Sequence, residues 1–483
     1  MAEAYVAGID SSTQSTKVEV RRVDDGTVVG TGRASHPSTT PPRSEQDPNA
    51  WWSALAAAFA QIDPEVRAGI VGVSVAGQQH GLVLVDEAGE PLRPAKLWND
   101  TESAPQTEAL VAASGADVWV DRCGSVPAPA FTVTKLAWVA EHEPELIDRI
   151  DRVMLPHDYL TWRLTGEHVT DRGDASGTGW WSPSIEEYVD EVLELVAPSV
   201  VDKLPSVLGP TAVAGTVTAE AANELGLPSN VVVGPGSGDN MGGALGLGLR
   251  TGDLAISIGT SGTAYAVSAI PTADETGLVA GFADATGNFL PLVCTLNATK
   301  VTEAFRRLLG ADYAEFDELA LSAPIGADGV VLVPYLDGER TPNRPTATGL
   351  LAGMRSDVER RQIARAAFEG VACGLLDGMQ ALESAGVSLG GRTFLIGGGA
   401  KSAAYRRIMA DLSQRQLTIP DDDETVATGA ALQAAVVAGH GSFVDMADRW
   451  SLGHGSLIDP DDRVVDAAAE ARLHYRWARD LTE

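Results

Sequence analysis

A short structural unit occurs twice in this 483-residue chain, and it limits the folds that the chain can adopt. The first copy is an apolar run ending at Asp10, a loop of small and hydroxyl-bearing residues, and a second apolar run through Val20. The second copy runs from Leu254 through the Gly-Thr-Ser-Gly-Thr loop at 259–263 to Val267. Each copy has the pattern of two strands joined by a tight loop. The pair predicts an internal duplication of a hairpin whose loop can approach a phosphate group.

The chain is too long for one ordinary core, and its length predicts two or three domains. A further apolar segment at 28–32 extends the first hairpin into a predicted antiparallel meander. Asp47 followed by Pro48 predicts the start of a helix. We place the domain boundary close to Gly248, with domains 1–247 and 248–483, and expect the last helix to pack back on the first domain. The alternation of strands and helices indicates an α/β protein.

Composition excludes several classes of protein. With 44% hydrophobic and 21% charged residues, the chain has the composition of a folded globular protein. A formal net charge of −31 argues against a nucleic-acid or anionic-membrane partner, because both are polyanions. No apolar run approaches the roughly 18 residues of a membrane helix, and we see no signal peptide. The cysteines are Cys123, Cys294 and Cys373, and their spacing indicates neither disulfides nor zinc, so we expect the cytoplasm.

The glycine-rich and hydroxyl-rich loops point to a nucleotide. Such loops let backbone N–H groups approach phosphate oxygens without interference from a Cβ atom. Neither hairpin loop has the Walker A or the Rossmann spacing, and each alone favours an ordinary tight hairpin, which uses the same residues. A third loop, Gly397-Gly398-Gly399, follows an apolar run and suits the approach of a flat base or ribose, although an ordinary helix entry uses the same residues. Three such loops in two domains predict a nucleotide bound by both.

Two aspartates stand where phosphoryl transfer would need carboxylates. Asp10 ends a strand beside the first loop, where it could hold Mg²⁺, which prefers one or two carboxylates together with phosphates. Asp239 precedes a glycine-rich helix, and the positive end of that helix favours a charged carboxylate. Taken alone, Asp10 has the pattern of a turn cap and Asp239 that of an ordinary helix N-cap. Together they suit the metal site and the base that transfer to an alcohol requires.

Two polar segments offer groups suited to a sugar. Gln78, Gln79 and His80 follow the apolar strand segment at 70–75 and offer neutral hydrogen bonds for hydroxyl groups. The segment Trp98-Asn99-Asp100 offers an aromatic wall and further polar groups. A lone histidine is more often a surface or core residue, so this assignment depends on the segments occurring together.

In this order, these segments resemble the FGGY family of carbohydrate kinases, in particular the branch that acts on D-xylulose. The resemblance runs through almost the whole chain. It is carried by residues 8–17, 44–52, 131–138, 155–160, 174–178, 236–240, 338–342 and 349–369. It implies two ribonuclease-H-like domains of the actin and hexokinase superfamily with a cleft between them. It also implies ATP-dependent phosphorylation of D-xylulose to D-xylulose 5-phosphate, with Mg²⁺.

The resemblance assigns a role to each matched residue. Asp239 would be the general base, and Asp10 would position Mg²⁺. The sugar would contact Gln79, His80, Gly81, Trp98, Asp239 and Asn240. ATP and its phosphates would contact Ser12, Thr13, Gln14, Lys17, Gly259, Thr260, Ser261, Gly397, Gly398, Gly399 and Ala400. The expected partners are a ketose and ATP, without nucleic acid or membrane, and a homodimer is one open assembly.

Two positions depart from the family pattern. Gln79 stands where methionine is usual, and Thr101-Glu102 stand where relatives commonly carry Gly-Arg. A reversed charge beside the sugar loop leaves ribulose, gluconate, glycerol or another polyol open as the substrate. An actin-like ATPase that is not a metabolic kinase would not need His80 or the Asp239–Asn240 pair. A sugar-binding regulator without activity would not need Asp10 and Asp239 intact.

Overall fold

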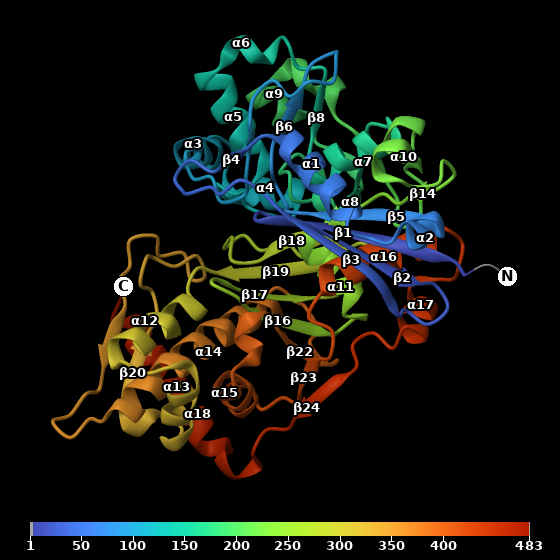
Figure 1. Ribbon diagram of the computed structural model, residues 1–483. Helices are drawn as coiled ribbons and strands as arrows, with labels where there is room; N and C mark the ends of the chain where they lie inside the picture. The colour runs from blue at the N-terminus through green and yellow to red at the C-terminus, as the bar shows by residue number, and fades with distance from the viewer. Residues whose placement is uncertain (1–2, 483) are drawn as a thin grey trace. The chain divides into compact units, whose positions relative to one another are not determined.

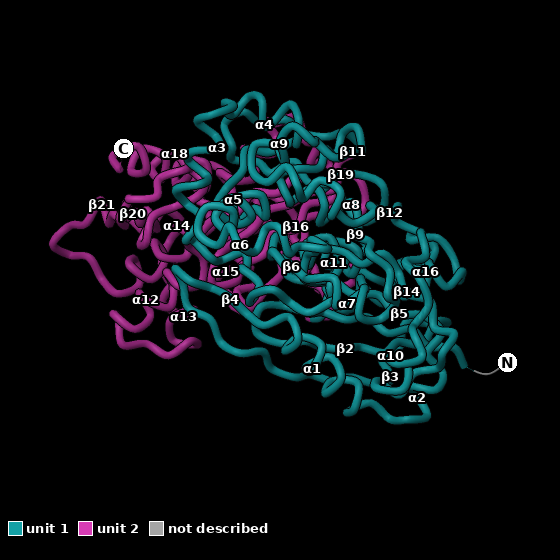
Figure 2. The backbone as a smooth tube through the Cα atoms, turned by 90° about the horizontal axis from the view of Figure 1, so that it is seen from above, with its two compact units in different colours: residues 1–249, 269–290, 424–452 teal, residues 250–268, 291–423, 453–483 magenta. Residues whose placement is uncertain are grey.

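The computed structural model describes residues 3–482 and divides into two compact units, coloured separately in Figure 2. Unit 1 comprises residues 1–249, 269–290 and 424–452, and unit 2 comprises residues 250–268, 291–423 and 453–483. The chain therefore passes between the units more than once. The expected boundary after residue 247 lies next to the first of these crossings.

Unit 1 is built on a seven-stranded sheet with the order β13-β14-β5-β1-β2-β3, and β15 also pairs with β5. Its strands, in chain order, are β1 (Tyr5–Ser11), β2 (Ser15–Arg22), β3 (Val28–Ser35), β4 (Glu45–Gln46), β5 (Ile70–Gly77), β6 (Val83–Val85), β7 (Ala95–Lys96), β8 (Arg152–Met154), β9 (Val169–Asp171), β10 (Trp181–Ser182), β11 (Glu187–Tyr188), β12 (Ser206–Leu208), β13 (Gly215–Thr216), β14 (Val232–Val233), β15 (Ser237–Gly238) and β18 (Ala280–Ala283). Its helices are α1 (Pro48–Phe59), α2 (Pro64–Ala68), α3 (Ala104–Ser114), α4 (Ala116–Cys123), α5 (Thr132–His142), α6 (Pro144–Ile147), α7 (Pro156–Thr165), α8 (Arg172–Ala175), α9 (Asp190–Val196), the 3-10 helix η1 (Pro198–Lys203), α10 (Ala219–Leu225), α11 (Asp239–Gly246), α16 (Thr425–Val437) and α17 (Phe443–Arg449).

The predicted meander is confirmed, because β1 pairs antiparallel with β2 and β2 pairs antiparallel with β3. The predicted helix start is confirmed as well, since the Asp47 side chain accepts a hydrogen bond from the backbone N–H of Asn49 and Pro48 opens α1. Successive residues of a strand point to opposite faces of a sheet. Ile9 on β1 joins a buried cluster with Trp51 and Phe59 of α1, whereas its neighbour Gly8 faces α16. Helices α1 and α16 therefore cover opposite faces of the sheet (Figure 1).

The register of the central strands determines where the polar loops of unit 1 emerge. Strands β1 and β5 are parallel, with Asp10 opposite Ala76. Strand β15 also runs parallel to β5, with Ser237 opposite the same Ala76. The carboxyl ends of parallel strands lie at one edge of a sheet, where open α/β sheets bind their ligands. Asp10, the loop after β5 and the start of α11 therefore meet at this edge.

Unit 2 has its own sheet, in which the strand order is β19-β17-β16-β22-β23-β24. Its strands are β16 (Leu254–Ile258), β17 (Gly262–Ala266), β19 (Phe289–Thr295, which begins before the unit boundary), β20 (Val331–Val333), β21 (Leu350–Ala352), β22 (Thr393–Ile396), β23 (Leu417–Pro420) and β24 (Gly455–Ile458). Its helices are α12 (Thr299–Leu309), α13 (Tyr313–Ser322), η2 (Ala327–Gly329), α14 (Arg360–Ser384), η3 (Gly398–Lys401), α15 (Ala403–Ser413), η4 (Asp462–Val464) and α18 (Val465–Asp480).

Unit 2 repeats the arrangement expected from the sequence. The hairpin of β16 and β17 encloses the loop at 259–261, and β22 lies parallel to β16 with Ile396 opposite Ser257. The Gly397–Gly399 segment therefore emerges beside the hairpin loop. The last helix, α18, lies in unit 2, and its expected packing on the first domain stays a prediction. The segment that belongs to unit 1 instead carries α16 and α17, because α16 packs its small residues against β1, β5 and α11.

None of the helices within residues 3–482 combines the length and apolar composition that a membrane-spanning segment requires.

The packing of α11 on α16 depends on glycine. A Cβ atom built on Gly429 would lie 1.8 Å from the backbone oxygen of Gly242, and one on Gly246 would lie 1.8 Å from that of Thr425. We expect Gly429→Ala to lower the apparent melting temperature by about 5 °C, because overpacking costs about 1–3 kcal/mol and backbone atoms cannot yield. The gain in helix propensity of about 1 kcal/mol is too small to compensate.

The measurement is differential scanning fluorimetry of the purified protein. Gly209→Ala is the matched control, since no heavy atom lies within 4 Å of a Cβ built there. Equal melting temperatures for Gly429→Ala and the native protein would contradict the proposed close packing.

Candidate active site

The carboxyl group of Asp10 lies at the edge of the first sheet, and neighbouring positive charges compensate its negative charge only in part. Its Oδ1 atom is buried and has no hydrogen-bond partner among residues 3–482. Burial raises the pKa of Asp10 from 3.8 to about 7, and the negative charges of Asp239 and Glu424 act in the same direction. The positive charges of Lys17 and Arg33 oppose this rise only in part. A cation at Asp10 would remove the cost of the buried charge.

Asp239 and Asn240 open α11 at the same edge. The backbone N–H and the side-chain Nδ2 of Asn240 donate to Asp239 Oδ1 over 2.8 and 3.0 Å. Burial raises the pKa of Asp239 from 3.8 to about 6, while the two Asn240 hydrogen bonds lower it. The carboxylate is therefore ionised at neutral pH and is a stronger base than an unperturbed aspartate.

The first predicted phosphate loop is a tight turn between β1 and β2. Ser12 closes it, since its N–H and hydroxyl both donate to the Ser15 carbonyl over 3.1 Å. The Thr13 hydroxyl donates to Gln78 Oε1 over 3.0 Å. Gln14 is exposed, and the Lys17 ammonium lies 2.6 Å from Glu424 at the start of α16. Lys17 thus pairs with a carboxylate in this structure, and its contact with phosphate stays a prediction.

His80 is held in a fixed orientation within the loop that follows β5. Its Nδ1 lies 2.8 Å from the carbonyl oxygen of Gly177, and because a carbonyl only accepts, Nδ1 carries the proton. The imidazole stacks on Phe131 with ring centroids 5.1 Å apart. The backbone of His80 has a φ of 67°, an uncommon conformation for a residue other than glycine. The next residue, Gly81, packs on Pro156, where an added Cβ would lie 2.6 Å from a ring carbon.

Trp98 joins the phosphate loop to the predicted sugar loop. The residue is 40% exposed, and its Nε1–H donates to the Thr13 hydroxyl over 3.0 Å. Thr13 in turn donates to Gln78, so Trp98, Thr13 and Gln78 form one chain of hydrogen bonds. The structure therefore brings together Asp10, Asp239 and the predicted sugar-loop residues within unit 1.

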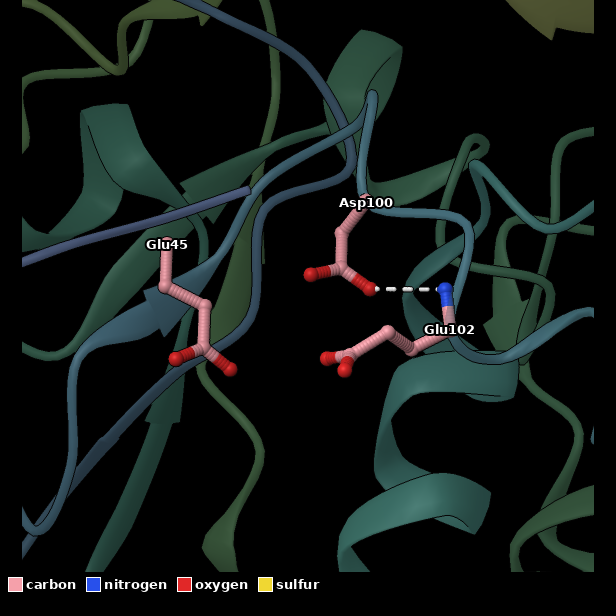
Figure 3. A group of neighbouring side chains, drawn as sticks. All are labelled: Glu45, Asp100 and Glu102. Carbon is pink, nitrogen blue, oxygen red and sulfur yellow. Dashed lines mark hydrogen bonds between the residues drawn. The ribbon is translucent and has the colours of Figure 1, made fainter. Parts of the chain in front are cut away.

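Three carboxyl groups gather beside this loop: Glu45, Asp100 and Glu102, with a hydrogen bond from Glu102 N–H to Asp100 (Figure 3). The fully buried ammonium of Lys96 compensates their charge, at 3.1 Å from Glu45, 3.2 Å from Asp100 and 2.7 Å from Glu102. The lysine therefore takes the place that a metal ion would need. Glu102, whose charge departs from the family pattern, is paired with Lys96.

The predicted adenosine loops of unit 2 border a cavity of about 590 Å³. Thr260, Gly398 and Gly399 line this cavity, whereas Gly259, Ser261, Gly397 and Ala400 do not. Gly259 and Gly397 instead hold the turns, accepting from the N–H groups of Thr299 and Ala400. A Cβ on Gly399 would lie 2.4 Å from Ile258 Cγ2, so glycine is needed where β22 leaves the sheet.

Most of the cavity wall comes from residues that sequence reasoning missed. They lie on the helices α12 to α15 and on the turn before α15, and are Thr299, Lys300, Thr302, Glu303, Arg306, Tyr313, Ala314, Phe316, Asp317, Phe368, Lys401, Ser402 and Tyr405. The Arg306 guanidinium lies 4.4 Å from the ring centroid of Tyr313, and both residues line the cavity. Aromatic and cationic side chains around an apolar floor suit a flat base. Apart from Phe368, which lies in the segment 349–369, these residues lie outside the segments that carry the family resemblance, so no local signal in the sequence identifies them.

A second group of residues that sequence reasoning missed surrounds His157 in unit 1. His157 is fully buried, and its Nε2 lies 3.2 Å from Asp158, 3.2 Å from Asp171 and 3.5 Å from Asp174. Burial alone lowers the pKa of His157, but the three carboxylates raise it to about 9. The imidazolium thus neutralises part of a buried acidic cluster. The helix α8 that carries Asp174 packs against β15 and so supports the strand that leads to Asp239.

Comparison with known proteins agrees with this geometry. Residues 5–246 match the N-terminal domain and residues 254–438 the C-terminal domain of the FGGY family of carbohydrate kinases. The chain is 47% identical over 461 residues to the xylulose kinase of Streptomyces coelicolor, covering 95% of this chain and 93% of that protein. It is 36% identical over 450 residues to the xylulose kinase of Haemophilus influenzae, covering 90% and 91%.

A crystal structure of xylulose kinase from Bifidobacterium adolescentis superimposes with a TM-score of 0.86 at 39% identity, covering 98% of this chain and 100% of that one. The expected fold class, two α/β domains of the actin and hexokinase type, is confirmed. Both family domains match in order, and the relatives are similar over nearly their whole length. This chain therefore belongs to the FGGY family of carbohydrate kinases.

Proposed function

We propose that this chain phosphorylates D-xylulose to D-xylulose 5-phosphate with ATP. The observation that carries the proposal is the meeting of Asp239 and Asn240 with the loop of Gln79 and His80 at one sheet edge, beside Asp10. Relatives that are 47% and 36% identical are named xylulose kinase, which supports the choice of sugar. The pairing of Glu102 with Lys96 supports it further, because this charge is compensated without a substrate.

In the proposed mechanism, Asp239 accepts the proton of the sugar C5 hydroxyl as its oxygen attacks the γ-phosphorus of ATP. The new bond joins that oxygen to phosphorus, the bond to the β,γ-bridging oxygen breaks, and ADP leaves with the bonding electrons. A pKa of about 6 keeps Asp239 ionised at neutral pH while making it more basic than an ordinary aspartate. Around the sugar we place His80, Gly81, Trp98 and Asn240, and we place Gln79 next to this group through its hydrogen bond with Asn240.

The nucleotide and its phosphates are proposed to meet Ser12, Thr13, Gln14, Lys17, Gly259, Thr260, Ser261 and the Gly397–Ala400 turn. The 590 Å³ cavity of unit 2 supports a base site at Gly398 and Gly399. The residues present fit Mg²⁺, because Asp10 offers a buried, unpartnered oxygen and a charge that its neighbours only partly compensate. Bound there, Mg²⁺ would neutralise phosphate charge. We also propose a cytoplasmic location, where ATP and the sugar are available.

The choice of sugar is tested by the substrate preference of the purified enzyme. We expect the highest kcat/KM for D-xylulose, measured by coupled ADP release across D-xylulose, ribulose, gluconate and glycerol. A pocket built to bind one set of hydroxyl groups leaves its own polar groups unpaired with another sugar. A higher kcat/KM for ribulose or a polyol would overturn the choice of sugar and leave the family unaffected.

The role of Asp239 is tested by its removal. Asp239→Ala should lower kcat by about 10² to 10⁴, because general-base catalysis contributes that much. ATP affinity, measured by isothermal titration, should stay close to native, since the nucleotide cavity lies in unit 2. Asp190→Ala is the control, because Asp190 also opens a helix, α9, but is exposed. Near-native turnover of Asp239→Ala would exclude it as the base.

The role of Asp10 is tested by Asp10→Asn, which keeps the shape and removes the charge. The variant should melt at a higher temperature than the native protein without ligands, because it lacks a buried, partly compensated charge. Mg²⁺ should then raise the melting temperature of the native protein and not that of the variant. An equal response of both proteins to Mg²⁺ would contradict the assignment.

A further inference from the structure

Gln79 is a buried residue whose position is set by packing. Only 4% of its surface is exposed, compared with 40% for Trp98 in the neighbouring segment. Its side chain lies against Gly238, where an added Cβ would be 2.6 Å from Gln79 Cγ and 2.8 Å from Cδ. Glycine at 238 therefore leaves the space that the Gln79 side chain fills. Little of this residue faces solvent, and its Nε2 atom is buried without a hydrogen-bond partner among residues 3–482.

A single chain of hydrogen bonds leads from Gln79 to Asp239. Asn240 Nδ2 donates to Gln79 Oε1 over 2.7 Å and to Asp239 Oδ1 over 3.0 Å. An ionised carboxylate only accepts, so the amide nitrogen of Asn240 must face Asp239. The second hydrogen on that nitrogen then requires an acceptor, which is the oxygen of Gln79. The Asp239 carboxylate thus determines the orientation of both amide groups, and Gln79 supplies the acceptor for the second hydrogen of Asn240 Nδ2.

We propose that Gln79 is a positioning residue for phosphoryl transfer, which acts on Asp239 through Asn240. By accepting from Asn240, Gln79 holds the amide against Asp239 Oδ1, where the Asn240 backbone N–H also donates. Both donors converge on Oδ1, which leaves Oδ2 to take the proton of the sugar hydroxyl. The inference rests on the proposed role of Asp239 as general base. Methionine at this position could fill the same space but could not accept from Asn240.

Other charged groups around Asp239 do not take part in this chain. Asp10 on β1 and Asp174 on α8 lie close enough for their pKa values to be raised by the charge of Asp239. Lys17, paired with Glu424 at the start of α16, acts on Asp10. A substitution at Gln79 leaves all four charges in place. Its effect on the pH dependence of turnover can therefore be attributed to the Asn240 amide.

A double-mutant cycle tests the proposal, with the full-length enzyme and the sugar it turns over best. Gln79→Met should lower kcat roughly 3- to 10-fold, the scale of one hydrogen bond, and leave the KM for the sugar within about twofold. Introduced into Asn240→Ala, the same substitution should cause no further loss of kcat, because the residue through which Gln79 acts is gone. A further loss in that background as large as in the native enzyme would overturn the proposal.

The pH profile of kcat gives a second measurement that a purely structural role would not change. Loss of the oriented amide removes a donor that favours the ionised carboxylate, so the acid limb of Gln79→Met should move to higher pH. The loss of kcat is then larger at pH 6 than at pH 8. Gln79→Glu keeps an acceptor for Asn240 but adds a negative charge, so it should recover kcat at pH 8 and show an acid limb at still higher pH.

Gln78→Met is the matched control, since the adjacent buried glutamine accepts from Thr13 and has no bond to Asn240. Its acid limb should stay at the native pH. A rise in sugar KM for Gln79→Met with unchanged kcat and acid limb would overturn the proposal and make Gln79 a simple sugar contact. Native-like turnover of Asp239→Ala would instead defeat the proposed base itself, and a preference for another sugar would defeat only the substrate.

Discussion

The parallel pairing of β5 with both β1 and β15 is the constraint on which the site of unit 1 depends. One residue, Ala76, lies opposite Asp10 on one side and opposite Ser237 on the other. Strand geometry then brings Asp10 and Asp239, which follows β15, to one edge of the sheet, although they are far apart in sequence. A shift of one residue in either register would turn Asp10 or the start of α11 toward the opposite face.

This arrangement buries the negative charge of Asp10 at the place where the chemistry is proposed. Two other buried cations of unit 1 lie beside carboxylates: Lys96 is close to three carboxylates and His157 to three aspartates. At Asp10, one carboxylate oxygen is buried without a hydrogen-bond partner among the described residues, as are oxygens of Asp158 and Asp174 beside His157. A protein that maximised stability would fill or neutralise this position. The uncompensated charge is consistent with a position that a bound cation completes.

Close backbone packing supports the same edge. Glycine at 246 and 429 lets α11 and α16 approach each other, and Gly8 lets α16 lie on β1. Because Asp239 is the first residue of α11, the position of its carboxylate follows from this contact. Small residues far from the reacting atoms thereby determine where the base lies, and side chains such as Gln79 then determine its orientation.

Sequence alone determined the type of elements and the residues at their ends. Strands, turns and helix starts follow from local patterns, which is why the meander of β1 to β3, the start of α1 and the duplicated hairpin could be predicted. Asp10, Asp239 and His80 could be identified because each lies in or beside a recognisable loop. Resemblance to a family then supplied roles that the patterns left open.

Only the tertiary structure decided which side chains pair with one another. Lys17 and Glu424 are separated by most of the chain, and Arg306 and Phe368 lie on other elements than the loop of Thr260, so no local pattern indicates such contacts. The pairing of Glu102 with Lys96 and the burial of His157 among aspartates also come from packing. Electrostatic effects depend on distance and burial in three dimensions, and these quantities exist only once the chain has folded.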